Sequence, residues 1–187
     1  DQEFLAIALR VMSEQLGAKS AVAVLRPPFD AGASIVVPFQ LDASLAGAFL
    51  SDLTGNCDCA IGDVPVLVPL AEDPCIEGTL LFGLLEQAGI SASLVYPLMR
   101  NEREVIGWAR FLFERSKMPQ LTAILAGQYV LCRMMLTLER IWLMRHAEST
   151  SAQLRAVFNG ALDAMLLVND EDTVISANPA THRMFGY

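Results

Sequence analysis

Hydrophobic side chains recur at helical spacing over residues 4–16, and short apolar runs rich in valine follow them. This spacing predicts an amphipathic helix that ends at Gly17, because glycine readily takes the left-handed conformation common after a helix. Residues 20–25 and 34–39 have the composition of strands, and the turn residues 30–32 between them predict a hairpin-like pair.

The middle of the chain alternates helical and strand patterns. Two apolar runs on either side of the polar segment 100–104 predict the strongest hairpin of the chain. The other elements that we expect are a short helix over residues 42–53 capped by Asp42, a strand over 64–70, a helix over 75–87, hairpin strands over 93–99 and 105–113, and one long helix from 118 to about 153. This order predicts an α+β fold.

The second hairpin strand carries aromatic side chains on both faces. At a period of two, Trp108 shares a face with Arg110 and Leu112, whereas Phe111 and Phe113 lie on the opposite face. We therefore interpret these aromatics as packing groups of the sheet rather than as an aromatic ligand box.

The long helix has two adjacent apolar stripes, so that one can cover a sheet while the other meets a partner helix. We predict a parallel homodimer through the first stripe; the alternative is that both stripes are buried in one monomeric core. The first stripe has heptad spacing and consists of Leu121, Ile124, Gln128, Leu131, Met135, Leu138 and Trp142. The second stripe consists of Leu125, Cys132, Leu136 and Leu143.

The element order and the hairpin sequence SLVYPLMRNEREVIGWARFLFE resemble a GAF domain. Hairpins of that family have an apolar strand ending near proline, a polar turn and an apolar strand with a glycine, here Gly107. The resemblance covers about residues 2–145. It implies a GAF-like antiparallel sheet flanked by helices in residues 1–117, and a closing, signalling helix over residues 118–153.

Residues 154–187 resemble the opening of a PAS domain. They comprise an entering helix, a strand over 164–169, a turn, a strand over 174–177, and the sequences Asn178-Pro179-Ala180 and Phe185-Gly186-Tyr187. A segment this short holds only the start of a PAS domain, and two strands alone are marginally stable. We therefore expect this truncated PAS opening to be disordered or to rest against a neighbouring chain.

Together the two resemblances imply a regulatory sensor and dimerisation module of a cytoplasmic bacterial signalling protein. Arrays of this kind usually precede a histidine kinase of a two-component system or an enzyme of cyclic-di-GMP signalling, which would lie outside this chain. No catalytic motif of these outputs is present, so we expect no enzyme activity. A GAF domain that binds no ligand and serves only as a scaffold is the alternative.

The charge distribution limits the partners and ligands. The 187 residues hold 13 Lys and Arg against 21 Asp and Glu, a net charge of −8, which argues against nucleic acid and anionic membranes. No apolar run approaches the ~18 residues of a membrane span. Residues 27–99, which include the segment that builds a GAF pocket, contain no Lys, Arg or His. Cyclic nucleotides, haem and bilins are therefore disfavoured, and a small neutral or cationic ligand is favoured; the cofactor is left open.

Three cysteines lie in the same segment. Cys57, Cys59 and Cys75 are candidates for redox or metal sensing, because their thiols could converge from two loops. Their spacing matches neither a zinc knuckle nor the cysteine set of GAF enzymes that reduce methionine sulfoxide. A reactive thiolate also needs cationic neighbours that this segment lacks. We favour ordinary loop or buried cysteines and predict no metal site.

Overall fold

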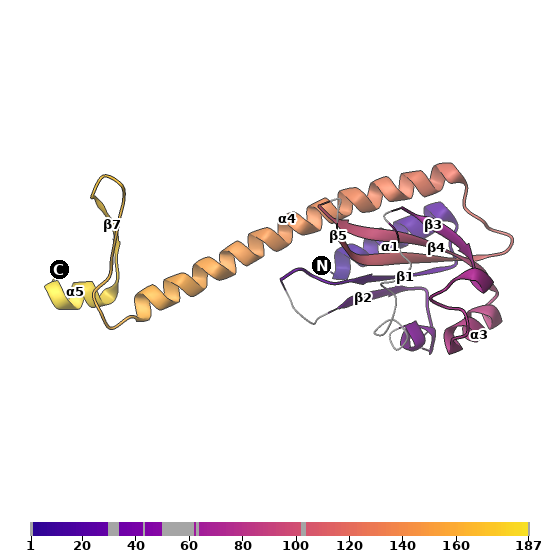
Figure 1. The fold of residues 1–187 in the computed structure, drawn as a ribbon, viewed down its shortest axis with the longest axis horizontal. Coiled ribbons are helices and arrows are strands. Elements are labelled where there is room, and N and C mark those ends of the chain that lie inside the picture. The colour runs from indigo at the N-terminus through magenta and orange to yellow at the C-terminus, as the bar shows by residue number, and fades with distance from the viewer. Residues whose placement is uncertain are drawn as a thin grey trace. The chain divides into compact units, whose positions relative to one another are not determined.

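The computed structural model describes residues 2–29, 34–42, 44–49, 62, 64–101 and 104–186 (Figure 1). The chain divides into two compact units, residues 1–140 and 141–187. The first unit contains α1 (Gln2–Leu16), β1 (Ser20–Leu25), β2 (Ile35–Phe39), a helical segment at 44–49, β3 (Val66–Pro69), the 3-10 helix η1 (Leu70–Glu72), α3 (Leu80–Gln87), β4 (Ile90–Arg100) and β5 (Glu104–Glu114). The helix α4 (Leu121–Gly160) passes from the first unit into the second, which also holds β6 (Leu166–Val168), β7 (Val174–Ala177) and α5 (Pro179–Phe185).

The first unit is built on a five-stranded sheet in the order β2-β1-β5-β4-β3. All its pairs are antiparallel, and the β4–β5 hairpin forms as the sequence predicts. Gly107 of β5 lies opposite Leu25 of β1, and a Cβ at this glycine would come within 2.2 Å of the Val24 carbonyl oxygen. Only glycine therefore allows the two central strands to approach in this register. The sheet and its helices confirm the α+β prediction.

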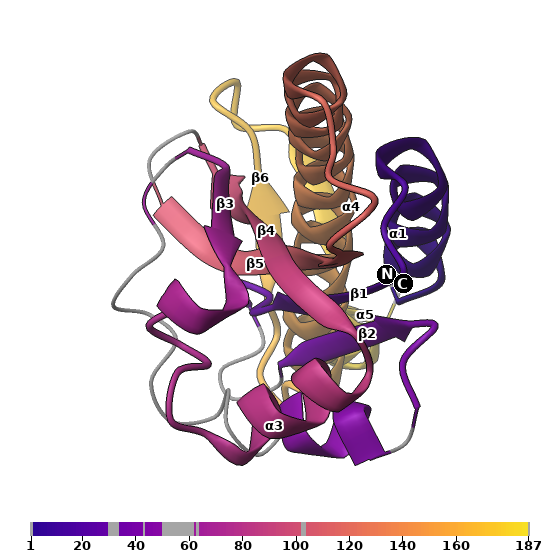
Figure 2. The ribbon, with the colours of Figure 1, turned by 90° about the vertical axis from the view of Figure 1, so that its right-hand side faces the viewer.

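One face of the sheet is covered by α1 and the first part of α4 (Figure 2). A Cβ at Gly127 of α4 would lie 2.6 Å from the Tyr96 hydroxyl of β4 and 3.0 Å from the Met12 methyl of α1. The Tyr96 hydroxyl donates a hydrogen bond to the Ile124 carbonyl at 2.9 Å, and its ring meets Phe111 edge-on at 5.6 Å between centroids. A glycine in the second turn of α4 thus lets the helix lie close to the sheet.

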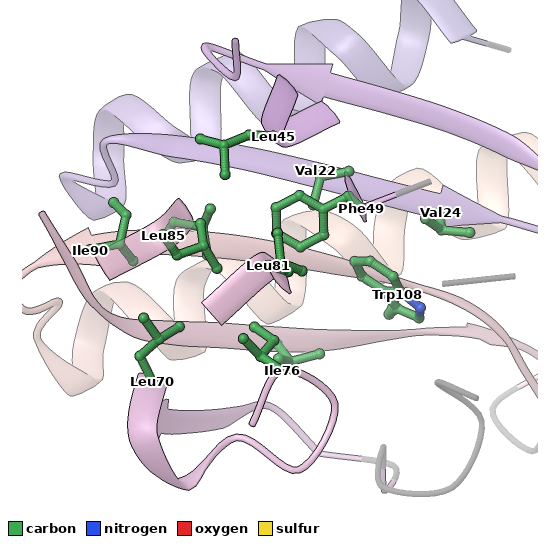
Figure 3. Packing of buried hydrophobic residues seen from close by; sticks show 12 residues of the cluster. Val22, Val24, Leu45, Phe49, Leu70, Ile76, Leu81, Leu85, Ile90 and Trp108 are labelled. Carbon is green, nitrogen blue, oxygen red and sulfur yellow. The ribbon is translucent and has the colours of Figure 1, made fainter. Parts of the chain in front are cut away.

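The opposite face is covered by the 44–49 segment, η1 and α3 (Figure 3). Trp108 and Leu112 are buried on this face, which confirms the predicted alternation along β5. Their neighbours form one apolar cluster: Val22, Val24, Leu45, Phe49, Leu70, Ile76, Leu81, Leu85, Ile90 and Val95. The chain's own side chains therefore occupy the centre of this face.

Three helix boundaries differ from the prediction. The long helix expected from residue 118 begins at Leu121, so Pro119 precedes its first turn. The helix expected from residue 75 begins at Leu80, because Gly78 has a φ of +74° and the Thr79 side chain caps the helix by accepting from the Phe82 N–H at 3.4 Å. Conversely, α4 continues to Gly160, beyond the expected end near residue 153, and absorbs the predicted entering helix of the PAS-like segment. The sequence offers no glycine or proline between residues 128 and 159 to interrupt it.

In the second unit, β6 and β7 form a hairpin that α5 follows. The buried Asn178 is its central hydrogen-bonding residue. Its Oδ1 accepts from the backbone N–H groups of Met165 and Thr181, and its Nδ2 donates to the carbonyls of Phe158, in the last turn of α4, and Asp163. In the structure this asparagine joins the end of α4, the start of the hairpin and the first turn of α5, so the tail has an ordered arrangement of its own; the expectation that it rests against a neighbouring chain stays a prediction.

Candidate functional site

The predicted cysteine site is only partly within the described residues. Cys57 and Cys59 lie outside them. Cys75 is half-buried, and its backbone N–H donates to Asp73 Oδ1 at 3.1 Å. Among the described residues, no three His, Cys, Asp or Glu side chains gather as metal ligands would.

A buried ion pair lies on the sheet face that α3 covers. Arg110 Nη1 of β5 donates to Asp73 Oδ2, in the turn after η1. The Ser93 hydroxyl of β4 donates to the same carboxylate oxygen at 2.8 Å and accepts from Arg110 Nη1 at 3.3 Å. The guanidinium lies 5.6 Å from the centre of the Trp108 ring. These contacts tie the turn between η1 and α3 to the middle of the sheet.

This pair is isolated from solvent. The side chains of Arg110 and Asp73 are only 1% and 3% exposed. Among the described residues, Arg110 Nε has no hydrogen-bond partner. The arrangement can neutralise one buried positive charge, and removing either partner would leave the other charge uncompensated in a medium of low dielectric constant.

The buried cation Arg110 was not predicted from the sequence. Residues 27–99 do lack basic side chains, but β5 lies between β1 and β4 and places Arg110 opposite Val22 and Val95. The charge of the sheet face therefore cannot be taken from residues 27–99 alone. The signal that could have found it was the face shared by Trp108, Arg110 and Leu112.

The predicted dimer stripe of α4 is mostly used within one chain. Leu131, Met135, Leu138 and Trp142 are buried, Ile124 and Gln128 are half-buried, and only Leu121, in the first turn, is largely exposed. The assignment of this stripe to a partner helix is therefore corrected for its four buried members. Two adjacent stripes look equivalent in sequence, and the close approach at Gly127 determines which one faces the sheet.

The neighbouring stripe lies on a more exposed side of α4. We call it the outward stripe and include Tyr129, which has the same heptad spacing and is 67% exposed. Its members are Leu125, Tyr129, Cys132, Leu136 and Leu143, all of them exposed. On α1, Phe4, Ile7 and Val11 are also exposed.

The two stripes make α4 unusually apolar. Among the described residues, α4 is the one helix whose length and composition would suffice for a membrane span. This differs from our expectation. Of its most apolar stretch, 28% is buried inside the protein. The exposed Arg133 lies within this stretch, and the buried stripe packs in the protein. The excess of apolar surface is the outward stripe.

Polar contacts also join the β4–β5 hairpin to α4. Besides the bond from Tyr96, Arg100 at the end of β4 forms an ion pair with Glu139 of α4 at 3.5 Å and with Glu104 of β5 at 3.7 Å. Burial raises the pKa of the Tyr96 hydroxyl, which therefore remains a donor at neutral pH. The helix is fixed to the hairpin at two points about four turns apart.

A pocket of about 260 Å³ lies between these two points. Its walls come from β4, the turn after it, and one side of α4. It lies on the face of the sheet that α1 and α4 cover, because Tyr96 and Leu131 contribute to it. The pocket is therefore separate from the face that holds Arg110.

Comparisons with known proteins agree with this architecture. Residues 152–187 match the PAS domain family. A domain assigned to a two-component sensor histidine kinase protein from Sinorhizobium meliloti has a similar structure, with a TM-score of 0.61 and 18% identity over 79% of this chain and 97% of that one. A GAF domain/HD domain protein from Geobacter sulfurreducens gives a TM-score of 0.56 and 14% identity over 76% and 94% of the two chains. The comparison with curated sequences found no significant match.

The chain thus has the fold of a GAF domain, followed by a PAS-like segment.

Proposed function

We propose that this chain is a regulatory module in which a GAF-like domain controls the position of α4, and that α4 passes this information to an output domain outside the chain. The observation that carries the proposal is the attachment of α4. Ile124 and Glu139 of α4 are held by Tyr96 and Arg100 of β4, and the helix then continues without interruption to Gly160 in the second unit. A change in the sheet is thereby converted into a shift or rotation of one rigid element.

The module acts as a parallel homodimer through the outward stripe. A long helix with a second heptad stripe of exposed Leu and Tyr side chains is expected to pair with another helix. A second copy is the natural partner, because identical residues then face one another along a two-fold axis. The module itself is non-catalytic, acts in the cytoplasm, and regulates a histidine kinase or a cyclic-di-GMP enzyme.

Sedimentation velocity at micromolar concentration tests the dimer. We expect the chain to sediment as a dimer and Leu136→Glu to sediment as a monomer, because a carboxylate would be buried in the helix seam. Thr137→Glu, at an exposed position one residue further along α4, should remain dimeric. A monomeric native chain, or equal disruption by both variants, would contradict the proposal.

Cysteine cross-linking tests the parallel register. Cys132 lies in the outward stripe, so its two copies should approach within reach of a disulfide in a parallel dimer. With Cys57, Cys59 and Cys75 replaced by Ser, copper phenanthroline should give a covalent dimer through Cys132. Failure to cross-link while the protein sediments as a dimer would point to an antiparallel or different interface.

The alternative of a GAF scaffold without a ligand on its α3-covered face has a specific observation in its favour. The centre of that face is occupied by the apolar cluster and by the pair of Arg110 and Asp73, and a pocket of about 690 Å³ remains at its edge, between η1, α3 and the start of β4. Native mass spectrometry of freshly purified protein distinguishes a ligand-free scaffold from a ligand-binding sensor, since a retained small molecule would favour the sensor. Cysteine-based sensing through Cys57, Cys59 and Cys75 stays a prediction.

A further inference from the structure

The pocket between β4 and α4 has walls of a distinctive chemistry. Three sulfur-bearing side chains line it, Met99 from β4 and Cys132 and Met135 from α4. Thioether and thiol sulfurs are polarisable and make favourable contacts with aromatic rings. A flat ring is therefore a better occupant of this space than a branched aliphatic group.

The polar groups of the pocket are uncharged. Asn101 and Gln128 supply amide groups, which can both donate and accept hydrogen bonds. None of the described residues that line the pocket is charged. The nearby Arg100 is already engaged by Glu139 and Glu104. A charged ligand would lose its hydration without gaining a counter-charge, whereas a neutral ring with one polar group would gain both contacts and hydrogen bonds.

We propose that this pocket is a regulatory site for a small uncharged aromatic molecule of one or two rings with a hydrogen-bonding group. Its volume of about 260 Å³ lies just below the ~300–1,000 Å³ typical of sites for drug-sized ligands. The site lies on the side of the sheet opposite Arg110 and the apolar cluster, so it is distinct from the face that α3 covers.

The position of the pocket gives the ligand a route to α4. One wall is the sheet, and the other includes Cys132 and Leu136 of the outward stripe. A bound ring would act as a wedge between the hairpin and the helix. This regulatory consequence rests on the proposed function, whereas the binding itself does not.

Methyl NMR of the full chain labelled with 13C at the methionine methyls tests the site, with indole as the probe. The eight methionines provide internal controls. We expect saturable ring-current shifts at the methyls of Met99 and Met135 and no shift at Met144 or Met184, which are exposed elsewhere. Indole-3-acetate, which has the same ring with a carboxylate, should bind at least tenfold more weakly.

Two substitutions at one position separate the pocket from the fold. Cys132→Phe should fill the space and weaken indole binding at least tenfold, whereas Cys132→Ser should leave it within about twofold. Circular dichroism checks that both variants fold. No shift at Met99 and Met135 up to millimolar indole, equal shifts at all exposed methyls, or equal binding of indole-3-acetate would overturn the proposal. Shifts that depend on protein concentration and ignore indole would assign the pocket to a second copy and also overturn it.

The oligomeric state and the α4 amide signals, recorded on the same samples, separate this proposal from the proposed function. Site-specific indole binding without any response of α4 would uphold the site and count against the relay. An intact dimer that binds no indole would remove the site and leave the relay standing.

Discussion

The ion pair between Arg110 and Asp73 offers the sharpest test of how this fold is held together. In Arg110→Met the apolar part of the side chain is largely kept, but Asp73 loses its counter-charge and, among the described residues, keeps the donors of Ser93 and the Cys75 N–H. In Asp73→Asn the amide oxygen can still accept, while the buried guanidinium of Arg110 loses its neutralising partner.

The magnitude follows from the burial of both groups, which are 1% and 3% exposed. Breaking a buried pair by removing one partner costs about 3–5 kcal/mol, since the remaining charge stays uncompensated. This is a large share of the ~5–15 kcal/mol by which domains are usually stable. The double variant Arg110→Met/Asp73→Asn removes both charges, and we expect it to be at least ~2 kcal/mol more stable than the sum of the single losses predicts.

Urea denaturation followed by tryptophan fluorescence measures all four proteins. Trp108 lies against Arg110, so its emission reports on this region as well as on unfolding. The conservative Arg110→Lys should recover only part of the loss, because a lysine cannot reproduce the planar guanidinium. A cost below ~1 kcal/mol for Arg110→Met, or single losses that simply add in the double variant, would refute a coupled buried pair.

Three further predictions concern single contacts. Gly127→Ala should lower the free energy of unfolding in urea by about 1–3 kcal/mol, because its Cβ would displace the Tyr96 hydroxyl. The control Gly83→Ala in α3, where a Cβ meets open space, should be neutral or stabilising. Equal effects of the two substitutions would argue against the close approach at Gly127. Asn178→Asp should lower hydrogen-exchange protection across β6 and β7 by about 1–3 kcal/mol, because it loses both Nδ2 donors. Asn169→Asp should be tolerated, because Asn169 Oδ1 only accepts there, from Glu171 and Thr173; unchanged protection in Asn178→Asp would remove the assigned role. The Leu45 N–H and the Ser44 hydroxyl both donate hydrogen bonds to the Asp42 carboxylate and lower its pKa. The contribution of Asp42 to the stability of the fold is therefore present above the unfolded pKa of ~3.9 and is lost as the pH falls through the lower folded pKa. Calorimetry between about pH 5 and pH 3 should therefore show a smaller fall in Tm for Asp42→Asn than for the native chain, and parallel curves would contradict this.

Local features of the fold were predictable because their causes are local. β1 and β7 have the bounds expected from their apolar runs, and the alternation along β5 correctly placed Trp108 and Phe111 on opposite faces. Gly17 ends α1 with a φ of +72°, as its position predicts. These assignments need only the period of the pattern and the conformational freedom of glycine.

The features that sequence reasoning missed depend on contacts between distant segments. The choice between the two stripes of α4 depends on Gly127 meeting Tyr96 and Met12, which no helical periodicity contains. The cation of the α3-covered face was missed because we weighed charge along the chain, whereas the sheet brings Arg110 to Asp73, 37 residues away. The late start of α3 was missed although Gly78 and Thr79 signal it, because the apolar pattern alone suggested an earlier start.

The unbroken run of α4 has a consequence for how its length can evolve. Each residue added to a helix turns everything beyond it by about 100°, and about seven residues nearly restore the direction. Insertions or deletions between Arg140 and Gly160 would therefore rotate the helix face beyond them: lengths of about seven, eleven or eighteen residues return that face to within about 20° of its direction, whereas lengths of about two or five residues turn it to the other side of the helix. Under the proposed relay, variants of this module that retain signalling should accordingly differ in this stretch by lengths that restore the direction of the helix face.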